Sequence, residues 1–169
     1  MIVFIRGKLV EISEEFLVID ANGIGYICYI TSQIYEKYLN SINKEISVST
    51  YQHITENSHT LFAFVDQIEK DIFMLLIGIS GIGPKTAIQM LSAINATELK
   101  NRIASGEVDM LTTVPGIGAK TAKRIILELK DKMMKIDLSY DEKNPISHNT
   151  IKEEALSALT TLGYNKVLA

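Results

Sequence analysis

A seven-residue pattern occurs twice in this chain, and its two copies are 35 residues apart. Residues 81–87 read GIGPKTA, and residues 116–122 read GIGAKTA. The correspondence extends before the glycines, where Leu76 matches Leu111 and Ile79 matches Val114. An internal repeat defines a structural unit. The unit predicted here is an apolar turn of helix, a Gly-x-Gly hairpin and a second helix.

Each part of this unit suits an anion. Glycine permits a tight turn and the close approach of another chain. The hairpin leads into a helix N-terminus, where unpaired N–H groups and the helix dipole attract negative charge. Lys85 and Lys120 lie in the first turns of these helices, where a cation opposes the dipole, so a bound phosphate explains them better than helix stability does. Two identical phosphate sites in tandem predict nucleic acid as the ligand.

Ile82 and Ile117 lie between the glycines, where each can anchor the turn against its own two helices. The complete pattern is a helix-hairpin-helix, which binds the DNA backbone independently of sequence. A dinucleotide site is excluded because neither copy completes Gly-x-Gly-x-x-Gly, and the glycine spacing of a Walker A loop is absent. The predicted DNA-binding residues are Gly81, Ile82, Gly83, Lys85, Thr86, Gly116, Ile117, Gly118, Lys120, Thr121, Lys123 and Arg124.

Two alternatives stay open on the sequence alone. Lys120, Lys123 and Arg124 fall on one face of the second helix. These three residues and Lys85 could be ordinary solvated helix surface. The hydroxyls of Thr86 and Thr121 could donate to phosphate or bond back within their own helices.

The net charge of −3 conceals a basic region around the repeats. Residues 1–70 carry 5 basic and 9 acidic side chains, whereas residues 71–135 carry 9 and 6. DNA affinity depends on where cations are placed, not on the total charge. The charge distribution is therefore compatible with DNA binding through the repeats.

Composition argues against several other classes of protein. Cys28 is the only cysteine and the three histidines show no ligand spacing, so we expect no disulfide, metal or cofactor. No catalytic constellation is visible, so we expect a protein that is not an enzyme. No apolar run is long enough to span a bilayer, and no signal pattern opens the chain, so cytoplasmic residence is expected.

The first 64 residues are predicted to form β-structure. Strand-like runs occur at residues 1–5, 8–12, 16–20, 25–30, 45–53 and 60–64. Gly7 is interpreted as a bend or bulge, residues 21–23 and 55–58 as hairpin turns, and residues 33–39 as a short helix. About five strands in so short a stretch predict a small closed barrel of the OB kind.

From Asp66 onwards the apolar period becomes helical. Asp66 is predicted to cap a helix in a variant of the capping box with Glu69, and Thr97 to cap a helix that ends at Ile103. The helix after the second hairpin is expected to end at about Met134.

The predicted fold class is α+β, in four segments. An OB-like barrel covers residues 1–64, and a tandem helix-hairpin-helix domain covers residues 65–135. The polar stretch at residues 136–150 predicts a flexible linker. Residues 151–162 are predicted to form an amphipathic helix, which begins a short C-terminal segment at residues 151–169.

The order of the predicted segments resembles that of the RuvA family: a barrel, tandem hairpins, a linker and a terminal helix. RuvA proteins are bacterial proteins that bind four-way Holliday junctions. The closest matches are residues 76–87 and 114–124. Further similar runs lie at residues 22–26, 128–132 and 153–164.

The resemblance implies structure-specific, sequence-independent junction binding in homologous recombination and DNA repair. It implies a homotetramer, with an octamer of two stacked tetramers as a larger form. It also implies the hexameric ATPase RuvB as a partner that drives branch migration, and the resolvase RuvC as a further candidate. The alternative reading is a helix-hairpin-helix accessory module or a nuclease of DNA repair.

The resemblance also implies an acidic pin in the barrel hairpin and a third domain that contacts the motor. The pin of the family is usually a pair of adjacent acids, whereas the matching residues here are Glu56 and Asn57, so one charge is missing. The sequence ends at Ala169, soon after the first helix of the third domain. Either the sequence is a shortened form or its motor binding is impaired.

Overall fold

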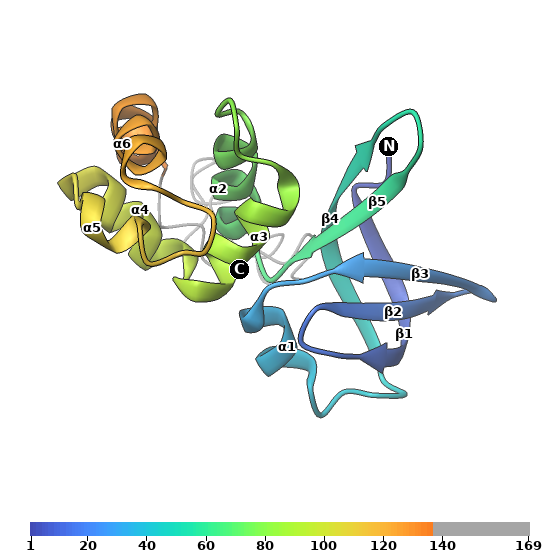
Figure 1. Ribbon diagram of the computed structural model, residues 1–169. Helices are drawn as coiled ribbons and strands as arrows, with labels where there is room; N and C mark the ends of the chain where they lie inside the picture. The colour runs from blue at the N-terminus through green and yellow to red at the C-terminus, as the bar shows by residue number, and fades with distance from the viewer. Residues whose placement is uncertain (137–169) are drawn as a thin grey trace, which may run out of the picture. The chain divides into compact units, whose positions relative to one another are not determined.

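Five strands close into a barrel at the N-terminal end of the chain (Figure 1). The computed structural model describes residues 1–136. The strands are β1 (Phe4–Ile12), β2 (Phe16–Ala21), β3 (Ile24–Tyr29), β4 (Glu45–Ile54) and β5 (His59–Phe64). Their order around the barrel is β1-β2-β3-β5-β4, and only the β3–β5 pair is parallel. A short helix, α1 (Ser32–Tyr38), separates β3 from β4. The predicted OB-like barrel is therefore confirmed.

Both predicted hairpin turns are present. Asn22 and Gly23 connect β2 to β3 with φ angles of 55° and 86°. Two consecutive positive φ angles are the conformation that an Asn-Gly hairpin turn requires. At the other hairpin, the N–H of Thr55 donates a 2.8 Å hydrogen bond to the carbonyl of Ser58 and closes the turn between β4 and β5.

The interpretation of Gly7 as a bulge was wrong. β1 is one strand from Phe4 to Ile12, and its register with β2 shifts between Leu9 and Glu11 instead. A Cβ atom on Gly7 would lie 2.2 Å from the carbonyl oxygen of Asp20. Gly7 is therefore required because β1 and β2 approach each other closely there.

Alternating side chains fill the barrel. The buried set includes Ile5 and Leu9 of β1 and Leu17 and Ile19 of β2, with Cys28 of β3 among them. Burial raises the pKa of the Cys28 thiol to about 12. Since the thiolate is the reactive form of cysteine, Cys28 acts as a small apolar core residue.

Within residues 1–136, five helices follow the barrel. They are α2 (Gln67–Ile77), α3 (Pro84–Ala93), α4 (Ala96–Ser105), α5 (Val108–Leu111) and α6 (Ala119–Met134). Their buried side chains form one hydrophobic cluster. The predicted end of α6 at Met134 is confirmed. None of the helices within residues 1–136 is long and apolar enough to cross a membrane.

The predicted caps of α2 and α4 had different outcomes. The side chain of Asp66 accepts a 2.7 Å hydrogen bond from the N–H of Glu69, as predicted. The cap of α4 is Asn95, whose side chain accepts a 2.9 Å hydrogen bond from the N–H of Glu98, so the prediction of Thr97 was wrong. Asn95 has the extended backbone of a capping residue, whereas Thr97 already lies in the first turn of the helix.

The helical region packs on the outer face of β5. The rings of Phe62 and Phe64 lie 5.5 Å and 4.8 Å from the ring of Phe73 in α2. Tyr51 of β4 adds a third ring, 5.4 Å from that of Phe73. Because the strands alternate, these aromatic residues face the helices while their neighbours fill the barrel. The predicted linker (apart from Ile136) and the predicted terminal helix lie outside the described residues.

Candidate nucleic-acid interface

The two Gly-x-Gly hairpins have the same backbone conformation. The first glycine of each is left-handed, with φ of 90° at Gly81 and 85° at Gly116. The second glycine of each is extended and caps the following helix, with φ and ψ of −89° and 169° at Gly83 and −85° and 167° at Gly118. The sequence repeat is therefore a structural repeat, down to the φ and ψ angles of its turns.

The hydrogen bonds within the hairpins repeat as well. The N–H of Ile82 donates to the carbonyl of Ile79 at 3.0 Å, and the N–H of Ile117 donates to the carbonyl of Val114 at 3.1 Å. Both isoleucines are only 4% exposed and belong to the hydrophobic cluster of the helical region. Each turn is therefore anchored by its central side chain, while its two glycines stay exposed at the surface.

The helices that follow the hairpins begin without side-chain caps. Asp66 and Asn95 cap α2 and α4, but α3 and α6 begin at glycine and receive no capping hydrogen bond. Within residues 1–136, no acceptor is present for the first N–H groups of α3 and α6, which belong to Lys85, Thr86, Ala119, Lys120 and Thr121. Unpaired N–H groups at a helix N-terminus attract an anion.

The two helix starts differ in their number of backbone donors, which was not predicted from the sequence. α3 begins with Pro84, which has no N–H group, whereas α6 begins with Ala119, which has one. The second hairpin therefore offers one more backbone donor than the first. The signal for this difference is present in the repeat itself, where GIGPKTA has proline and GIGAKTA has alanine after the second glycine.

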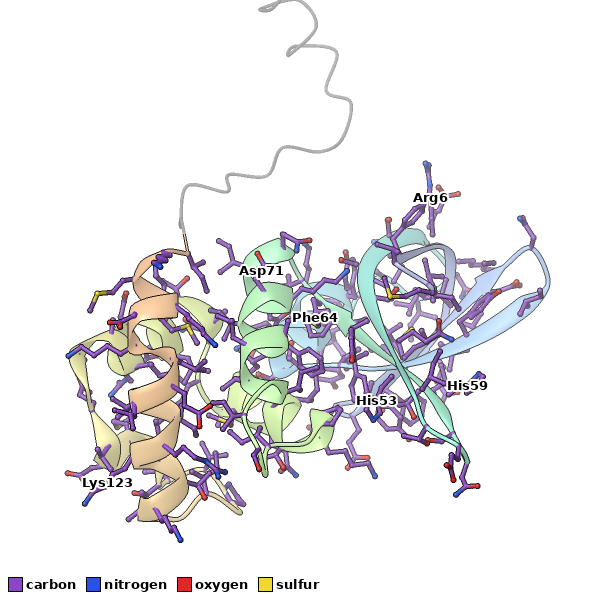
Figure 2. The ribbon with its side chains drawn as sticks, turned by 90° about the horizontal axis from the view of Figure 1, so that it is seen from above. Arg6, His53, His59, Phe64, Asp71 and Lys123 are labelled. Carbon is purple, nitrogen blue, oxygen red and sulfur yellow. The ribbon has the colours of Figure 1, made fainter. Side chains whose placement is uncertain are left out.

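Most of the predicted basic residues are exposed beside the hairpins. Lys85 lies in the first turn of α3, and Lys120 and Lys123 lie in the first two turns of α6. Figure 2 shows Lys123 on the surface of α6. Each of these ammonium groups can add positive charge to a helix start that already attracts anions. The three lysines could contact phosphate from these positions.

The two predicted threonines are half-buried, and neither hydroxyl bonds back to a carbonyl within the described part of the chain. The hydroxyls of Thr112 and Thr113 do so, at 2.6 Å and 2.7 Å, in the turn before the second hairpin. Thr86 and Thr121 thus retain a free donor next to the helix N-termini.

The side chain of Arg124 lies differently from those of the exposed lysines. It belongs to α6, yet its Nη2 atom lies 3.1 Å from the position that a Cβ atom on Gly81 would occupy. Its guanidinium group therefore reaches the first hairpin, although the residue follows the second. The sequence spacing put Arg124 on a face with Lys120 and Lys123, but it could not show where a long side chain ends.

Glu56 and Asn57 form the exposed tip of the β4–β5 hairpin. The arms of this hairpin carry His53 and His59 (Figure 2). The structure therefore presents the single predicted pin carboxylate to solvent. Among the residues described, no group of three or more histidine, cysteine, aspartate or glutamate side chains could hold a metal ion.

Comparison with known proteins identifies both halves of the described chain. Residues 1–63 match the family model described as RuvA N terminal domain, and residues 73–131 match the model of a SAM-like helix-hairpin-helix tandem.

Curated relatives match over nearly the full length of the chain, and each is described as a Holliday junction branch migration complex subunit RuvA. The protein of Cytophaga hutchinsonii is 46% identical, over 100% of this chain and 86% of the relative. That of Christiangramia forsetii is also 46% identical, over 98% and 84%. That of Flavobacterium psychrophilum is 43% identical, over 97% and 83%.

Proposed function

The chain belongs to the RuvA family, and from this premise we propose that it binds four-way Holliday junctions as the non-catalytic subunit of a branch migration complex. Recognition is by structure and not by base sequence. The protein holds the junction, and a partner ATPase supplies the work of branch migration. This function belongs to homologous recombination and DNA repair.

The observation that carries this proposal is the pair of uncapped helix starts that follow glycine hairpins of the same backbone conformation. Each start offers free N–H groups at an exposed glycine turn, with a lysine in the first turn of the helix. Such groups bind phosphate oxygens, which lets two hairpins grip phosphates of one duplex arm. Phosphate contacts carry little base information, so specificity arises from the shape of the DNA.

A homotetramer extends the same grip to all four arms of a junction. In this arrangement each subunit holds one arm, and the exposed Glu56 of each subunit lies near the junction centre. The motor partner is RuvB, and RuvC resolves the junction. The complex works in the cytoplasm. Light scattering of the free protein tests the tetramer, and a monomer would contradict it.

The test of the function is a competition gel shift with four-way junctions and linear duplexes of equal length. We expect the junction to bind much more tightly. Equal affinity for the two DNAs would contradict the proposal. Incubation of the same protein and junction with Mg²⁺ or Mn²⁺ provides a second test, since strand cleavage would indicate a nuclease.

A further inference from the structure

We propose that Arg124, a residue of the second helix-hairpin-helix, belongs to the phosphate site of the first. In this arrangement the first site comprises the Gly81–Gly83 turn, Lys85 and the Arg124 guanidinium, so one site is built from both repeats. The inference rests on the proposed function, because its ligand is the phosphodiester backbone that the hairpins bind.

The guanidinium of Arg124 lies against the turn of the first hairpin. Arg124 Nη2 lies 3.1 Å from the place where a Cβ atom on Gly81 would sit, and no other atom meets that position within 4 Å. The equivalent position on Gly116 has no atom within 4 Å. The first hairpin therefore has a cation against its turn, supplied by α6, and the second hairpin does not.

The contact between the two repeats is not reciprocal. The repeat spacing places Gln89 of α3 where α6 has Arg124. Gln89 lines a groove of about 600 Å³ together with Lys85 and Pro115, and it does not reach Gly116. The contact between the two repeats therefore depends on Arg124 itself and does not follow from their similar folds.

Arg124 has a carboxylate at ion-pair distance but no hydrogen bond to it. Arg6 and Arg102, the other arginines of the chain, donate from Nε to Glu45 and Glu98 at 2.6 Å and 2.9 Å. Arg124 Nε lies 4.0 Å from the Glu128 carboxylate, too long for a hydrogen bond, and is buried without a partner within the described residues. A guanidinium that is not held by a carboxylate can bind a phosphate through two parallel hydrogen bonds.

The two helix starts have different numbers of backbone N–H donors. Pro84 removes one backbone donor from the first helix start, where Ala119 keeps it in the second. A guanidinium beside Gly81 replaces that donor and adds a full positive charge. The side chain of Arg124 is 40% exposed, so its outer nitrogen atoms can reach a ligand.

A pair of double-mutant cycles tests the assignment. Junction affinity is measured for Lys85→Ala, Lys120→Ala and Arg124→Gln, and for Arg124→Gln combined with each lysine variant. Groups that bind one phosphate are coupled, whereas distant groups act additively. We expect Arg124 to couple with Lys85 by roughly threefold or more in the dissociation constant, and to couple less with Lys120, its neighbour one turn earlier on α6. Coupling with Lys120 that equals or exceeds the coupling with Lys85, or coupling with neither lysine, would overturn the inference.

A second measurement, made without DNA, checks the contact itself. Gly81→Ala and Gly116→Ala share a positive φ, but only the methyl group at position 81 meets Arg124. We expect Arg124→Gln to reduce the loss of thermal stability caused by Gly81→Ala and to leave that of Gly116→Ala unchanged. Equal effects on both glycine variants would refute the contact.

If neither lysine variant weakens junction binding, the hairpin mechanism itself fails, which is a distinguishable result.

Discussion

The hydroxyl of Thr31 donates a 2.7 Å hydrogen bond to the buried carboxylate of Glu69, joining the start of α1 to the first turn of α2. The second carboxylate oxygen of Glu69 accepts a 2.6 Å hydrogen bond from the N–H of Val65. One acid therefore connects three segments at the junction of the barrel and the helices. Burial raises the pKa of Glu69, and the two hydrogen bonds offset this only in part.

The raised pKa of Glu69 makes stability depend on pH. An acid whose pKa rises on folding binds its proton more tightly in the folded state, so its contribution to stability is lost as the pH rises through the folded pKa. We expect the free energy of unfolding of the wild type, relative to Glu69→Gln, to fall from roughly pH 4 upwards. Urea unfolding of both proteins across this range measures the difference. A constant difference at every pH would contradict a raised pKa.

Comparison of Glu69→Ala with Glu69→Gln separates the effect of the hydrogen bonds from the effect of the charge. Glu69→Ala removes both acceptor oxygens and leaves the Val65 N–H without its partner. We expect Glu69→Ala to be less stable than Glu69→Gln by roughly 1–3 kcal/mol at all pH values, because neither variant titrates at this position. Glu69→Gln retains one acceptor and a group that can donate to Thr31, so it is the control of matched shape.

The predicted role of Glu69 illustrates what sequence can and cannot supply. Its spacing from Asp66 indicated a capping box, in which Glu69 would bond the N–H of the cap residue. The carboxylate bonds Val65 and Thr31 instead. Thr31 is 38 residues away, and a long-range contact of this kind leaves no local signal in the sequence.

The tandem hairpins, by contrast, were predictable because every constraint on them is local. The positive φ at Gly81 and Gly116, the burial of Ile82 and Ile117, and the start of α6 all follow from short motifs. The position of Arg124 Nη2 against Gly81 did not follow, because it depends on how the two repeats pack.

Gly7 provides a second stability prediction. Gly7→Ala places a methyl group 2.2 Å from the backbone oxygen of Asp20, where two strands of the barrel would have to separate. We expect a loss of roughly 3 kcal/mol or failure to fold. Gly25→Ala is the matched control, because the nearest atom to its methyl group is a side-chain carbon of Val18 at 3.8 Å. Thermal unfolding of the two variants compares them, and equal stability would contradict the close approach of β1 and β2.

Lys85→Ala and Lys120→Ala test whether the lysines at the helix starts contact phosphate. We expect each change to weaken binding to all DNA sequences alike and to reduce the slope of log affinity against log salt by about one. Lys130→Ala, an exposed lysine farther along α6, is the control and should leave the slope unchanged. A titration over a range of salt concentrations gives the slopes. Equal slopes for all variants and the wild type would show that the two lysines point away from DNA.

The glycine turns should matter more than either lysine. Gly116→Val puts a β-branched side chain at φ of 85° where DNA must approach, so we expect a larger loss of affinity than from Lys120→Ala. Gly118→Ala is a milder substitution than Gly116→Val, since the φ of Gly118 is −85° and no atom lies within 4 Å of the new methyl group. We expect Gly118→Ala to keep the thermal stability of the wild type and to lose affinity. Normal junction binding by a folded Gly116→Val protein would remove the hairpin from the mechanism.

The last prediction concerns the exposed tip of the β4–β5 hairpin. In the proposed tetramer the four Glu56 carboxylates approach the junction centre, where they repel phosphates and exclude paired DNA. Asn57 occupies the place of a second acid, so each subunit contributes one charge from this pair of positions. Exposed charges are screened over ~10 Å at 0.1 M salt, so the repulsion is strongest at low salt.

Glu56→Gln should therefore leave junction affinity equal or tighter while it weakens discrimination against linear duplex, because a duplex no longer meets a negative centre. Asn57→Asp should do the reverse and exchange affinity for selectivity. The measured quantity is the ratio of duplex to junction dissociation constants for the wild type and both variants, at one fixed low salt concentration. We expect this ratio to fall for Glu56→Gln, to rise for Asn57→Asp, and to converge on the wild-type value for both as salt is added. If Glu56→Gln leaves the ratio unmoved at low salt, Glu56 is a solvated turn residue and this hairpin takes no part in selecting the junction.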